Sequence, residues 1–353
     1  MRHNVGVQSI DFYQKHLNQV SRSFAFCIAR LEEPLRRWVS SSYLICRLLD
    51  TVEDAPWNDK RCQKDQFEQF NRFLNESPQE LHSRNWQLQF PDAIPEGEKK
   101  LIQDARMIFF DYHQFPELVK ESIGKMVKSM SRGMAYFSQR SEIRVSQLKE
   151  LNQYCFFVAG VVGEILTKLI QVKSPDWKLN PSHWVDAYHF GLFLQKINLL
   201  KDQLVDEKEG RFFIYNREEV RQSLVGNLSG AKRYLDSIPK KQKGYRLFCA
   251  WSLYLGVASL PYMEKSFCNK KNFKIPRIRT IQLVSAIERS LDDATQLDRL
   301  FLDLMGQTGL TFTDMPFKPP LSCRVGDIEE WFKSAYGDGE LDQNGLAQLG
   351  VVV

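Results

Sequence analysis

Apolar residues recur at spacings of three and four over most of the chain, which is the pattern of amphipathic helices. Runs in which apolar and polar residues alternate are scarce, and no Asn-Gly turn lies between two strand-like runs. The breaks fall at clusters of Pro, Gly and polar residues, namely 77–96, 173–182, 206–211 and the tail after 306. The spacing predicts helical segments at 20–55, 64–75, 97–112, 114–140, 146–172, 182–206, 217–236, 242–268 and 280–306.

This pattern predicts an all-α fold. The chain has 353 residues, which is long enough for one large domain or two ordinary ones and for a sizeable core. No repeat at a fixed period and no shift in composition marks a second domain. We therefore expect one helical domain over 1–306 and a mostly irregular tail over 307–353, where several Pro and Gly residues occur.

Composition and charge exclude several classes of protein. Charged residues make up 26% and hydrophobic residues 43%, which is a globular balance and not a disordered one. The formal net charge is only +5, and aromatic and basic residues do not interleave in a stacking pattern, so no nucleic-acid partner is expected. The seven cysteines form no CxxC pair, which favours a reduced, cytoplasmic chain.

One segment resembles a membrane span. Residues Leu247–Met263 run without a charge for 17 residues, whereas a spanning helix needs about 20 mostly apolar residues. Two serines, a glycine and a proline interrupt this run, so a buried core helix is the favoured interpretation. The N-terminus has no continuous apolar core and does not predict a secretory signal.

A first acidic stripe lies in the predicted segment 20–55. Tyr43, Arg47, Asp50 and Asp54 are spaced by four, three and four residues, and Glu53 lies three beyond Asp50. On a helix these side chains share one face. The remaining positions are apolar, namely Leu44, Ile45, Leu48, Leu49 and Val52. Taken alone, such a face is also typical of an ordinary solvated surface with an Arg–carboxylate pair.

A second stripe lies in the segment 182–206. Gln195, Asn198, Asp202 and Asp206 are spaced by three, four and four residues, and apolar side chains fill most of the remaining circumference. A helix that is apolar nearly all round should be buried. Buried carboxylates are unfavourable unless a partner neutralises them, and oxygen ligands select a hard cation such as Mg²⁺.

Two such stripes favour one kind of chemistry. Facing each other across a helical bundle, they could hold several Mg²⁺ ions together with the diphosphates of prenyl substrates. The metal would neutralise a leaving diphosphate, so that the C–O bond ionises to an allylic cation. Apolar walls would shelter that cation from water.

Four segments resemble, in order and at similar separations, the signatures of the squalene and phytoene synthase family. They are Ser21–Phe24 (SRSF), Tyr43–Asp54 (YLICRLLDTVED), Tyr154–Leu166 (YCFFVAGVVGEIL) and Gly191–Arg211 (GLFLQKINLLKDQLVDEKEGR). The similarity covers roughly 10–305, and the late segments FCAWSL and NFKIPRIR are similar to the squalene branch. The resemblance implies an isoprenoid-synthase bundle with a central cavity. It implies Mg²⁺-dependent head-to-head condensation of two farnesyl diphosphates to presqualene diphosphate, followed by NADPH-dependent reduction to squalene.

The resemblance also assigns roles to single residues. The Mg²⁺ ligands would be Asp50, Glu53, Asp54, Asn198, Asp202 and Asp206. The residues that contact the diphosphates, hold the ligands or line the pocket would be Ser21, Arg22, Phe24, Tyr43, Arg47, Gln195, Lys201, Arg211 and Phe248. Tyr154 would act at the cation stage, through its ring or through its hydroxyl in proton transfer. The phosphates of NADPH would be bound by Lys274 and Arg277, with Arg279 as a substitute.

Plainer interpretations remain open for two of these features. Tyr154 precedes the small residues Ala159, Gly160 and Gly163, which permit close helix packing, so it could be a core tyrosine. The basic cluster could be a solvated loop or a patch that faces phospholipid; its members are Lys270, Lys271, Lys274, Arg277 and Arg279.

The sequence departs from the family pattern at three places, and the last two leave the product open. Lys201 stands where arginine is usual and lacks the bidentate fork. Phe212–Tyr215 (FFIY) replaces an aromatic followed by Trp-Pro, and Arg246-Leu247 stands where the animal enzymes place a phenylalanine. The alternative is therefore a presqualene diphosphate, dehydrosqualene or phytoene synthase that acts without NADPH. A non-catalytic binding protein is disfavoured because both acidic motifs are intact.

The chain shows no C-terminal membrane anchor, so we expect a cytoplasmic monomer with peripheral membrane contact for product release.

Overall fold

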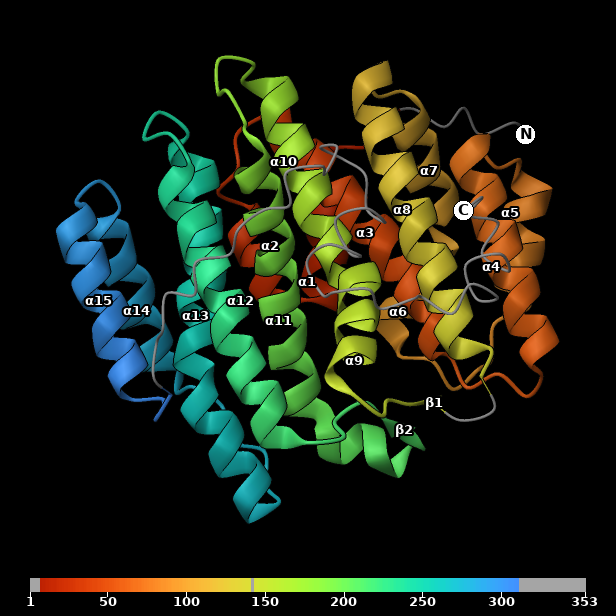
Figure 1. Ribbon diagram of the computed structural model, residues 1–353. Helices are drawn as coiled ribbons and strands as arrows, with labels where there is room; N and C mark the ends of the chain where they lie inside the picture. Colours follow the sequence, from red (N-terminus) through yellow and green to blue (C-terminus); the bar gives the residue numbers. More distant parts are fainter. Residues whose placement is uncertain (1–6, 141–142, 311–353) are drawn as a thin grey trace. The chain divides into compact units, whose positions relative to one another are not determined.

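The computed structural model describes residues 7–140 and 143–310. Helices dominate this part of the chain, and its strands are the two-residue pair β1 (Ile143–Arg144) and β2 (Arg211–Phe212), which run parallel (Figure 1). The all-α prediction is confirmed. The chain divides into two compact units, one with residues up to Arg140 and Lys168–Asp176, the other with Ser141–Thr167 and the residues from Trp177. A single domain over 1–306 stays a prediction, and most of the predicted irregular tail lies outside the described residues.

The first unit is built around one long helix. Its helices are α1 (Ile10–Val20), α2 (Arg22–Ile28), α3 (Leu35–Asp54), α4 (Lys60–Asn75), α5 (Glu80–Gln87), α6 (Glu96–Gln103), α7 (Ala105–His113) and α8 (Glu117–Ser138). Helix α3 contacts α1, α4, α6, α7 and α8. Its buried positions are the predicted ones, since the side chains that are fully buried include Leu44, Ile45, Leu48, Leu49 and Val52. Each such burial contributes roughly 1.5–3 kcal/mol.

Some helix boundaries in this unit differ from the prediction. The expected segment 20–55 is interrupted between α2 and α3, where Pro34 takes the N-cap position. Segment 97–112 is divided at Asp104 into α6 and α7. Helix α5 lies within a stretch predicted as a break, because its Trp86 is 2% exposed and packs against the rings of Phe73 and Phe90. Tertiary packing there outweighs the local Pro signals.

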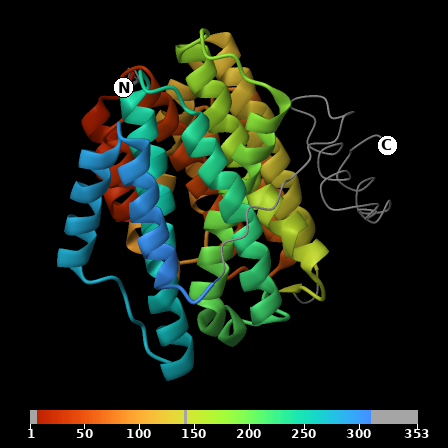
Figure 2. The same ribbon diagram turned by 60° about the vertical axis from the view of Figure 1, so that its left-hand side comes forward.

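The second unit is also built around one helix. Its elements are α9 (Leu148–Cys155), the π-helix η1 (Phe156–Gly160), the start of α10 (Val161–Lys173), α11 (Pro181–Lys208), α12 (Arg217–Ser237), α13 (Lys243–Asn269), α14 (Arg277–Ser290) and α15 (Ala294–Gly306). Helix α11 contacts α9, η1, α12 and α13. Helices α14 and α15 lie side by side along α13 (Figures 1 and 2).

Glycines allow η1 and α10 to approach α11 closely. A Cβ added to Gly163 would lie 2.0 Å from the carbonyl oxygen of Ala187, and one added to Gly191 would lie 2.1 Å from that of Ala159. No side chain fits at these distances, so both positions require glycine. The predicted role of the small residues after Tyr154 in close packing is confirmed.

The apolar segment Leu247–Met263 lies within α13 and forms part of the core, as predicted. Trp251 and Tyr254 are fully buried there. Within the described residues, the stretch that is long and apolar enough to cross a bilayer is Leu148–Lys173, and 61% of its most apolar window is buried. A core helix meets the same criteria of length and composition.

A buried polar network joins α11 to α12. Lys196 is 0% exposed, and its Nζ donates to Ser223 Oγ at 2.6 Å and to Asn227 Oδ1 at 2.5 Å. Asn227 Nδ2 lies 2.8 Å from His189 Nδ1. Burial lowers the pKa of Lys196 to about 8 from its ordinary 10.5. The helix pair is therefore less stable when Lys196 is protonated.

Replacing Lys196 by methionine is expected to change how stability depends on pH. Because the folded pKa lies below the unfolded one, the stability of the parent protein relative to the variant rises from pH 8 to 10.5. The full difference is roughly 3 kcal/mol. Urea unfolding of both proteins across this pH range measures it, with the exposed Lys208→Met on the same helix as control. Parallel stability curves for the parent and Lys196→Met would contradict the assignment.

Candidate active site

The first acidic stripe forms an ion-pair cluster on α3. Arg47 Nη1 lies 3.5 Å from Asp50 Oδ2, and Arg47 Nη2 pairs with Glu98 Oε1 of α6. Glu98 is 8% exposed, and no spacing in the sequence indicates that it pairs with Arg47. Among the described residues, Arg47 Nε is buried with no hydrogen-bond partner. The cluster therefore combines several carboxylates with one guanidinium that retains an unused donor.

Negative charge is crowded at Asp50. Burial raises the pKa of Asp50 to about 7; Arg47 opposes the rise, and Asp54 and Glu98 add to it. Asp54 is also the last residue of α3, where the helix dipole places partial negative charge. The Asp50 side chain is still 34% exposed, so a soluble cation can reach it. Burial and charge therefore favour a bound cation at this end of α3.

Polar contacts fix the end of α3 that carries these acids. Gln63 Nε2 donates to the carbonyl oxygens of Val52 at 3.2 Å and Glu53 at 2.8 Å. Trp57 Nε1 donates to the Val52 carbonyl at 2.8 Å. Helix-terminal carbonyls otherwise lack partners, so these bonds hold the last turn in place.

An aromatic edge borders the cluster. The rings of Phe24 and Tyr43 lie 5.3 Å apart between centroids. Burial raises the pKa of Tyr43 to about 12, and a hydrogen bond with the Ser21 side chain opposes that rise. The structure thus brings Ser21, Phe24 and Tyr43 together beside Arg47, whereas Arg22 is exposed at the start of α2.

The second acidic stripe lies near the C-terminal end of α11. Lys201 Nζ lies 3.1 Å from Asp202 Oδ2, and both side chains are about half exposed, at 52% and 48%. Asp206 is 8% exposed and accepts a hydrogen bond from Arg211 Nη2 at 2.8 Å. Gly210 adopts a φ of +77°, which lets the chain turn after α11 and bring Arg211 back to Asp206.

The rest of this stripe is more open than the sequence predicts. Gln195 is half-buried and Asn198 is exposed. Val205 is 54% exposed. The expectation that α11 is buried nearly all round is therefore wrong at this end. Neighbouring helices cover only part of its last turns, which leaves Asn198, Lys201 and Asp202 accessible to solvent.

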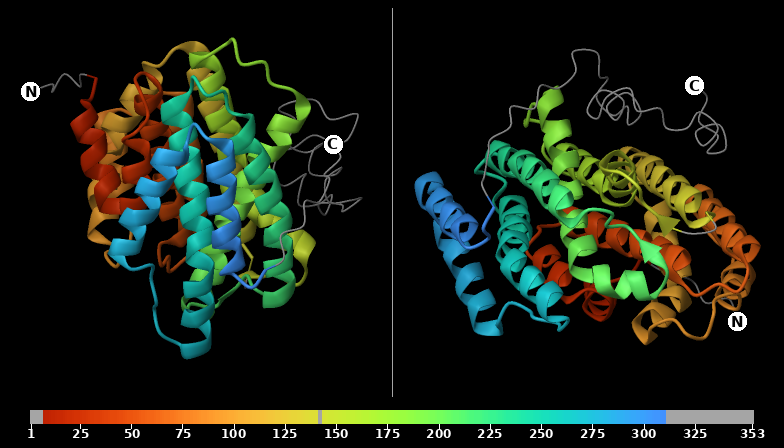
Figure 3. Two further views of the ribbon diagram at one scale, coloured as in Figure 1. Left: turned by 90° about the vertical axis from the view of Figure 1, so that its left-hand side faces the viewer. Right: turned by 60° about the horizontal axis from the view of Figure 1, so that its bottom comes forward.

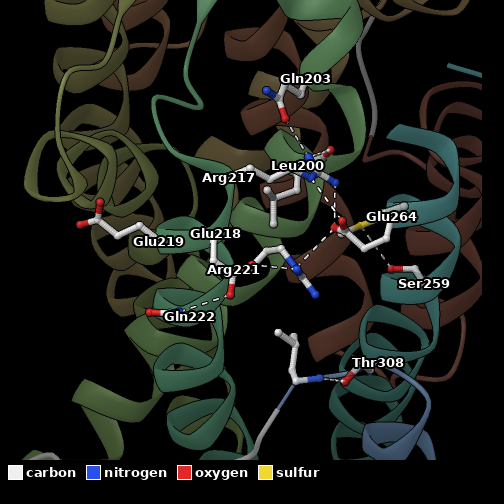
Figure 4. A network of polar contacts seen from close by, with 12 residues as sticks. Leu200, Gln203, Arg217, Glu218, Glu219, Arg221, Gln222, Ser259, Glu264 and Thr308 are labelled. Atoms are coloured by element: carbon white, nitrogen blue, oxygen red, sulfur yellow. Dashed lines mark hydrogen bonds and ion pairs between the residues drawn. The ribbon is translucent and has the colours of Figure 1, made fainter. Parts of the chain in front are cut away.

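A polar network holds the turn of α11 that carries Asp202 (Figure 4). Arg217, the first residue of α12, donates to the carbonyl oxygen of Leu200 at 3.0 Å and to Gln203 Oε1 at 2.7 Å. Its Nη2 also lies 2.8 Å from Glu264 Oε1 of α13. Arg217 thus ties residues on both sides of Asp202 to two other helices, and the sequence reading gave no signal for it.

Tyr154 lies in the last turn of α9, two residues before the start of the π-helix η1. It is 6% exposed and stacks on Phe213 with a centroid distance of 4.6 Å. Phe213 lies two residues after Arg211, which binds Asp206, so a short segment links Tyr154 to the second acidic motif. π-Helical turns inside helical segments frequently occur at functional sites. Phe213 belongs to the segment that departs from the family pattern.

The departure at Arg246-Leu247 has a structural explanation. Arg246 is 7% exposed and donates to the carbonyl oxygens of Ile238 at 3.0 Å and Leu291 at 2.9 Å, which follow α12 and α14. Its guanidinium therefore joins helix ends. Phe248 is 5% exposed and stacks on Tyr245 with a centroid distance of 6.1 Å.

The predicted cofactor-binding residues lie at the surface of the second unit. Lys274 is exposed in the linker before α14, and Arg277 is the first residue of that helix. Arg279 Nη2 donates to Gln307 Oε1 at 3.0 Å, so part of its guanidinium is already engaged.

Neither acidic motif, as far as the structure describes it, provides a complete set of protein ligands for a metal ion. Over 7–140 and 143–310, no group of three or more His, Cys, Asp or Glu side chains is arranged to hold a metal ion. Mg²⁺ is usually held by one or two carboxylates together with waters and substrate phosphates. The paired aspartates and the crowding at Asp50 fit that kind of site better than an all-protein cage.

Comparisons with known proteins show which family the chain belongs to. The sequence profile of the squalene/phytoene synthase family matches residues 17–222. Squalene synthase from Bos taurus is 32% identical over 199 residues, which are 56% of this chain and 45% of that protein. Squalene synthase from Homo sapiens is 31% identical over 199 residues, which again are 56% of this chain and 45% of that protein. The match spans about half the length of these curated relatives.

Solved structures show the same fold. A ligand complex of TcSQS has a TM-score of 0.71 at 21% sequence identity and covers 93% of this chain and 97% of that chain. A dehydrosqualene synthase with a ligand has a TM-score of 0.52 at 18% identity and covers 80% and 96%. These likenesses establish the isoprenoid-synthase helical fold.

Proposed function

Because this chain belongs to the squalene/phytoene synthase family, we propose that it is a squalene synthase. It condenses two farnesyl diphosphates head to head to presqualene diphosphate and then reduces this intermediate to squalene with NADPH. The observation that carries the proposal is that each unit presents an intact aspartate motif beside an arginine, Asp50 with Arg47 and Asp206 with Arg211.

The two motifs are proposed to hold Mg²⁺. The proposed ligands are Asp50, Glu53 and Asp54 for the motif on α3, and Asn198, Asp202 and Asp206 for the motif on α11. The donors are all oxygens, as this ion prefers. Burial, together with the neighbouring Asp54 and Glu98, raises the pKa of Asp50, and a bound cation would oppose that rise. When bound, Mg²⁺ neutralises the diphosphate that leaves.

The remaining site residues bind and orient the substrates. Guanidinium groups suit phosphate oxygens, so the buried unused Nε of Arg47 is proposed to donate to a diphosphate. The residues proposed to share this task are Ser21, Arg22, Gln195, Lys201 and Arg211. Phe24, Tyr43 and Phe248 supply apolar walls that exclude water from the cation.

The reductive step is assigned to the surface basic residues. Lys274 and Arg277 are exposed and make no ion pair with another described residue, so their charges are available to the phosphates of NADPH. Arg279 can substitute only partly, because it already binds Gln307. We propose that the enzyme acts as a cytoplasmic monomer.

One incubation tests the proposal. Purified protein, farnesyl diphosphate and Mg²⁺ are combined with and without NADPH, and the products are read by gas chromatography and mass spectrometry. Squalene that forms only with NADPH supports both half-reactions. No prenyl product in either tube would refute the enzymatic assignment.

A second candidate is a synthase that acts without NADPH and yields presqualene diphosphate, dehydrosqualene or phytoene. The stack of Phe213 on Tyr154 favours it, because a residue from the divergent segment 212–215 contacts the tyrosine proposed to act at the cation stage. The same hydrocarbon or diphosphate in both tubes would support this candidate.

Replacing Lys274 and Arg277 together by alanine is expected to slow squalene formation about tenfold or more while presqualene diphosphate forms at the parent rate. The reason is that only the reductive step uses the cofactor phosphates, and charge-assisted hydrogen bonds are the strong ones. Accumulation of presqualene diphosphate at limiting NADPH measures the effect. Equal loss of both half-reactions would rule out cofactor contacts.

A further inference from the structure

A stretch of one sign of charge crosses from α13 into α14. Residues 265–287 contain six Lys and Arg and no Asp or Glu; the basic ones are Lys265, Lys270, Lys271, Lys274, Arg277 and Arg279. All six are exposed. Lys270, Lys271, Lys274 and Arg277 make no ion pair with another described residue. This surface, which we name the cationic segment, therefore keeps an uncompensated positive charge.

Two large apolar side chains are exposed next to these basic residues. Ile278 is 64% exposed and Ile281 is 55% exposed, and they lie three residues apart on one face of α14. In the sequence, Ile278 lies between Arg277 and Arg279, and Ile281 lies two residues after Arg279. The left-handed Lys270, with φ of 50°, ends α13, and this end extends beyond α15 in the views of Figures 2 and 3. The part of the cationic segment at this end of α13 thus projects beyond α15.

We propose that the cationic segment docks on the surface of an anionic lipid bilayer through Lys270, Lys271, Ile278 and Ile281, which leaves Lys274 and Arg277 to the cofactor. Lysine and arginine attract anionic headgroups, and isoleucines on the same helix face enter the boundary between headgroups and acyl chains. The inference goes beyond the proposed function and does not depend on it. If the product is squalene, the contact also brings the enzyme to the phase that dissolves this product.

The apolar side chains favour lipid over a nucleic acid. Both partners carry phosphates, which explains the charge but not two exposed isoleucines. Single-stranded nucleic acids are bound through aromatic side chains on which bases stack, whereas aliphatic side chains beside basic ones suit a lipid interface. Phe273 is half-buried, with the Lys265 ammonium 4.6 Å from its ring centroid, and is therefore engaged within the protein.

Vesicle flotation with the full chain tests the proposal. Vesicles are made of phosphatidylcholine alone, or with a third of the lipid replaced by phosphatidylglycerol. The protein is expected to float with the anionic vesicles only and to be released at high salt, because screening shortens the reach of its charges. Equal flotation with neutral vesicles, or binding of a mixed-sequence RNA without binding of vesicles, would overturn it.

Matched variants locate the contact. Lys270→Gln with Lys271→Gln is expected to lower the partition coefficient about tenfold or more. Ile278→Ser with Ile281→Ser is expected to lower it by a similar factor. The controls are Lys64→Gln on α4 and Leu118→Ser on α8, which are equally exposed in the other unit. Parent-like binding by either double variant, with helical circular dichroism intact, would overturn the assignment.

The assay keeps this inference separate from the proposed enzyme activity. Vesicle binding is measured without substrate, Mg²⁺ or NADPH, so a protein that makes no squalene can still bind anionic vesicles. Lys270, Lys271, Ile278 and Ile281 are not among the proposed substrate or cofactor ligands, so turnover of these variants in detergent is expected to match the parent.

Discussion

Asp50→Asn is expected to lower kcat/KM for farnesyl diphosphate by about a thousandfold at saturating Mg²⁺. Asparagine keeps the size of the side chain and removes its charge, so the loss reports on the carboxylate rather than on packing. Removing one preorganised electrostatic group from an active site lowers the rate by about 10²–10³. Here the variant also loses a proposed metal ligand and the ion pair with Arg47. Product formation measured over a range of Mg²⁺ concentrations checks the prediction.

A carboxylate elsewhere in the same unit provides the control for this prediction. Asp65 is exposed on α4, and Asp65→Asn is expected to keep parent activity. Both variants should keep the helical circular dichroism of the parent, since Asp50 is not part of the apolar face of α3. Calorimetry with a non-reactive farnesyl diphosphate analogue should show weaker Mg²⁺-dependent binding in Asp50→Asn. Retained turnover in that variant would remove Asp50 from the metal site.

The pattern of α3 could be predicted because it is local. A helix with apolar residues at three- and four-residue spacings buries its apolar face. The sequence therefore predicts that Arg47 and Asp50 lie together on the other face of α3. Glu98 could not be predicted, because it pairs with Arg47 from 51 residues away. The raised pKa of Asp50 also depends on this tertiary neighbour and on burial, neither of which the spacing contains.

The same limit applies to α11. Its acidic spacing identified Asp202 and Asp206, but the network around Arg217 joins three helices and carries no periodic signal. The buried Lys196 was part of an apolar stretch and gave no sign of its partners on α12. Residues that hold a site in place make contacts between helices, and these contacts leave no periodic pattern in the sequence. Residues that face a ligand from one helix recur with the period of that helix, so the sequence can predict them.

Packing also explains the role of the residues that depart from the family pattern. Arg246 binds two helix-end carbonyls, so its side chain serves the fold of α12 to α14. Phe213 instead contacts Tyr154. Of the departures at Arg246 and Phe213, only that at Phe213 contacts the proposed catalytic Tyr154, which makes Tyr154 and Phe213 the pair whose substitution best tests the late steps of the reaction.

Tyr154→Phe is expected to lower turnover about a hundredfold while leaving the affinity for a farnesyl diphosphate analogue unchanged. The variant keeps the ring that stacks on Phe213 and removes only the hydroxyl, and proton transfer by a positioned side chain contributes about 10²–10⁴ in rate. Phe213→Leu removes the stack and keeps the hydroxyl, so a loss below about tenfold is expected there. Single-turnover product analysis of both variants separates the two roles. The opposite result, parent turnover in Tyr154→Phe and a large loss in Phe213→Leu, would contradict a role of the hydroxyl in proton transfer. It would assign the catalytic role of Tyr154 to its stacked ring, because the reaction would then need the aromatic pair and not the hydroxyl.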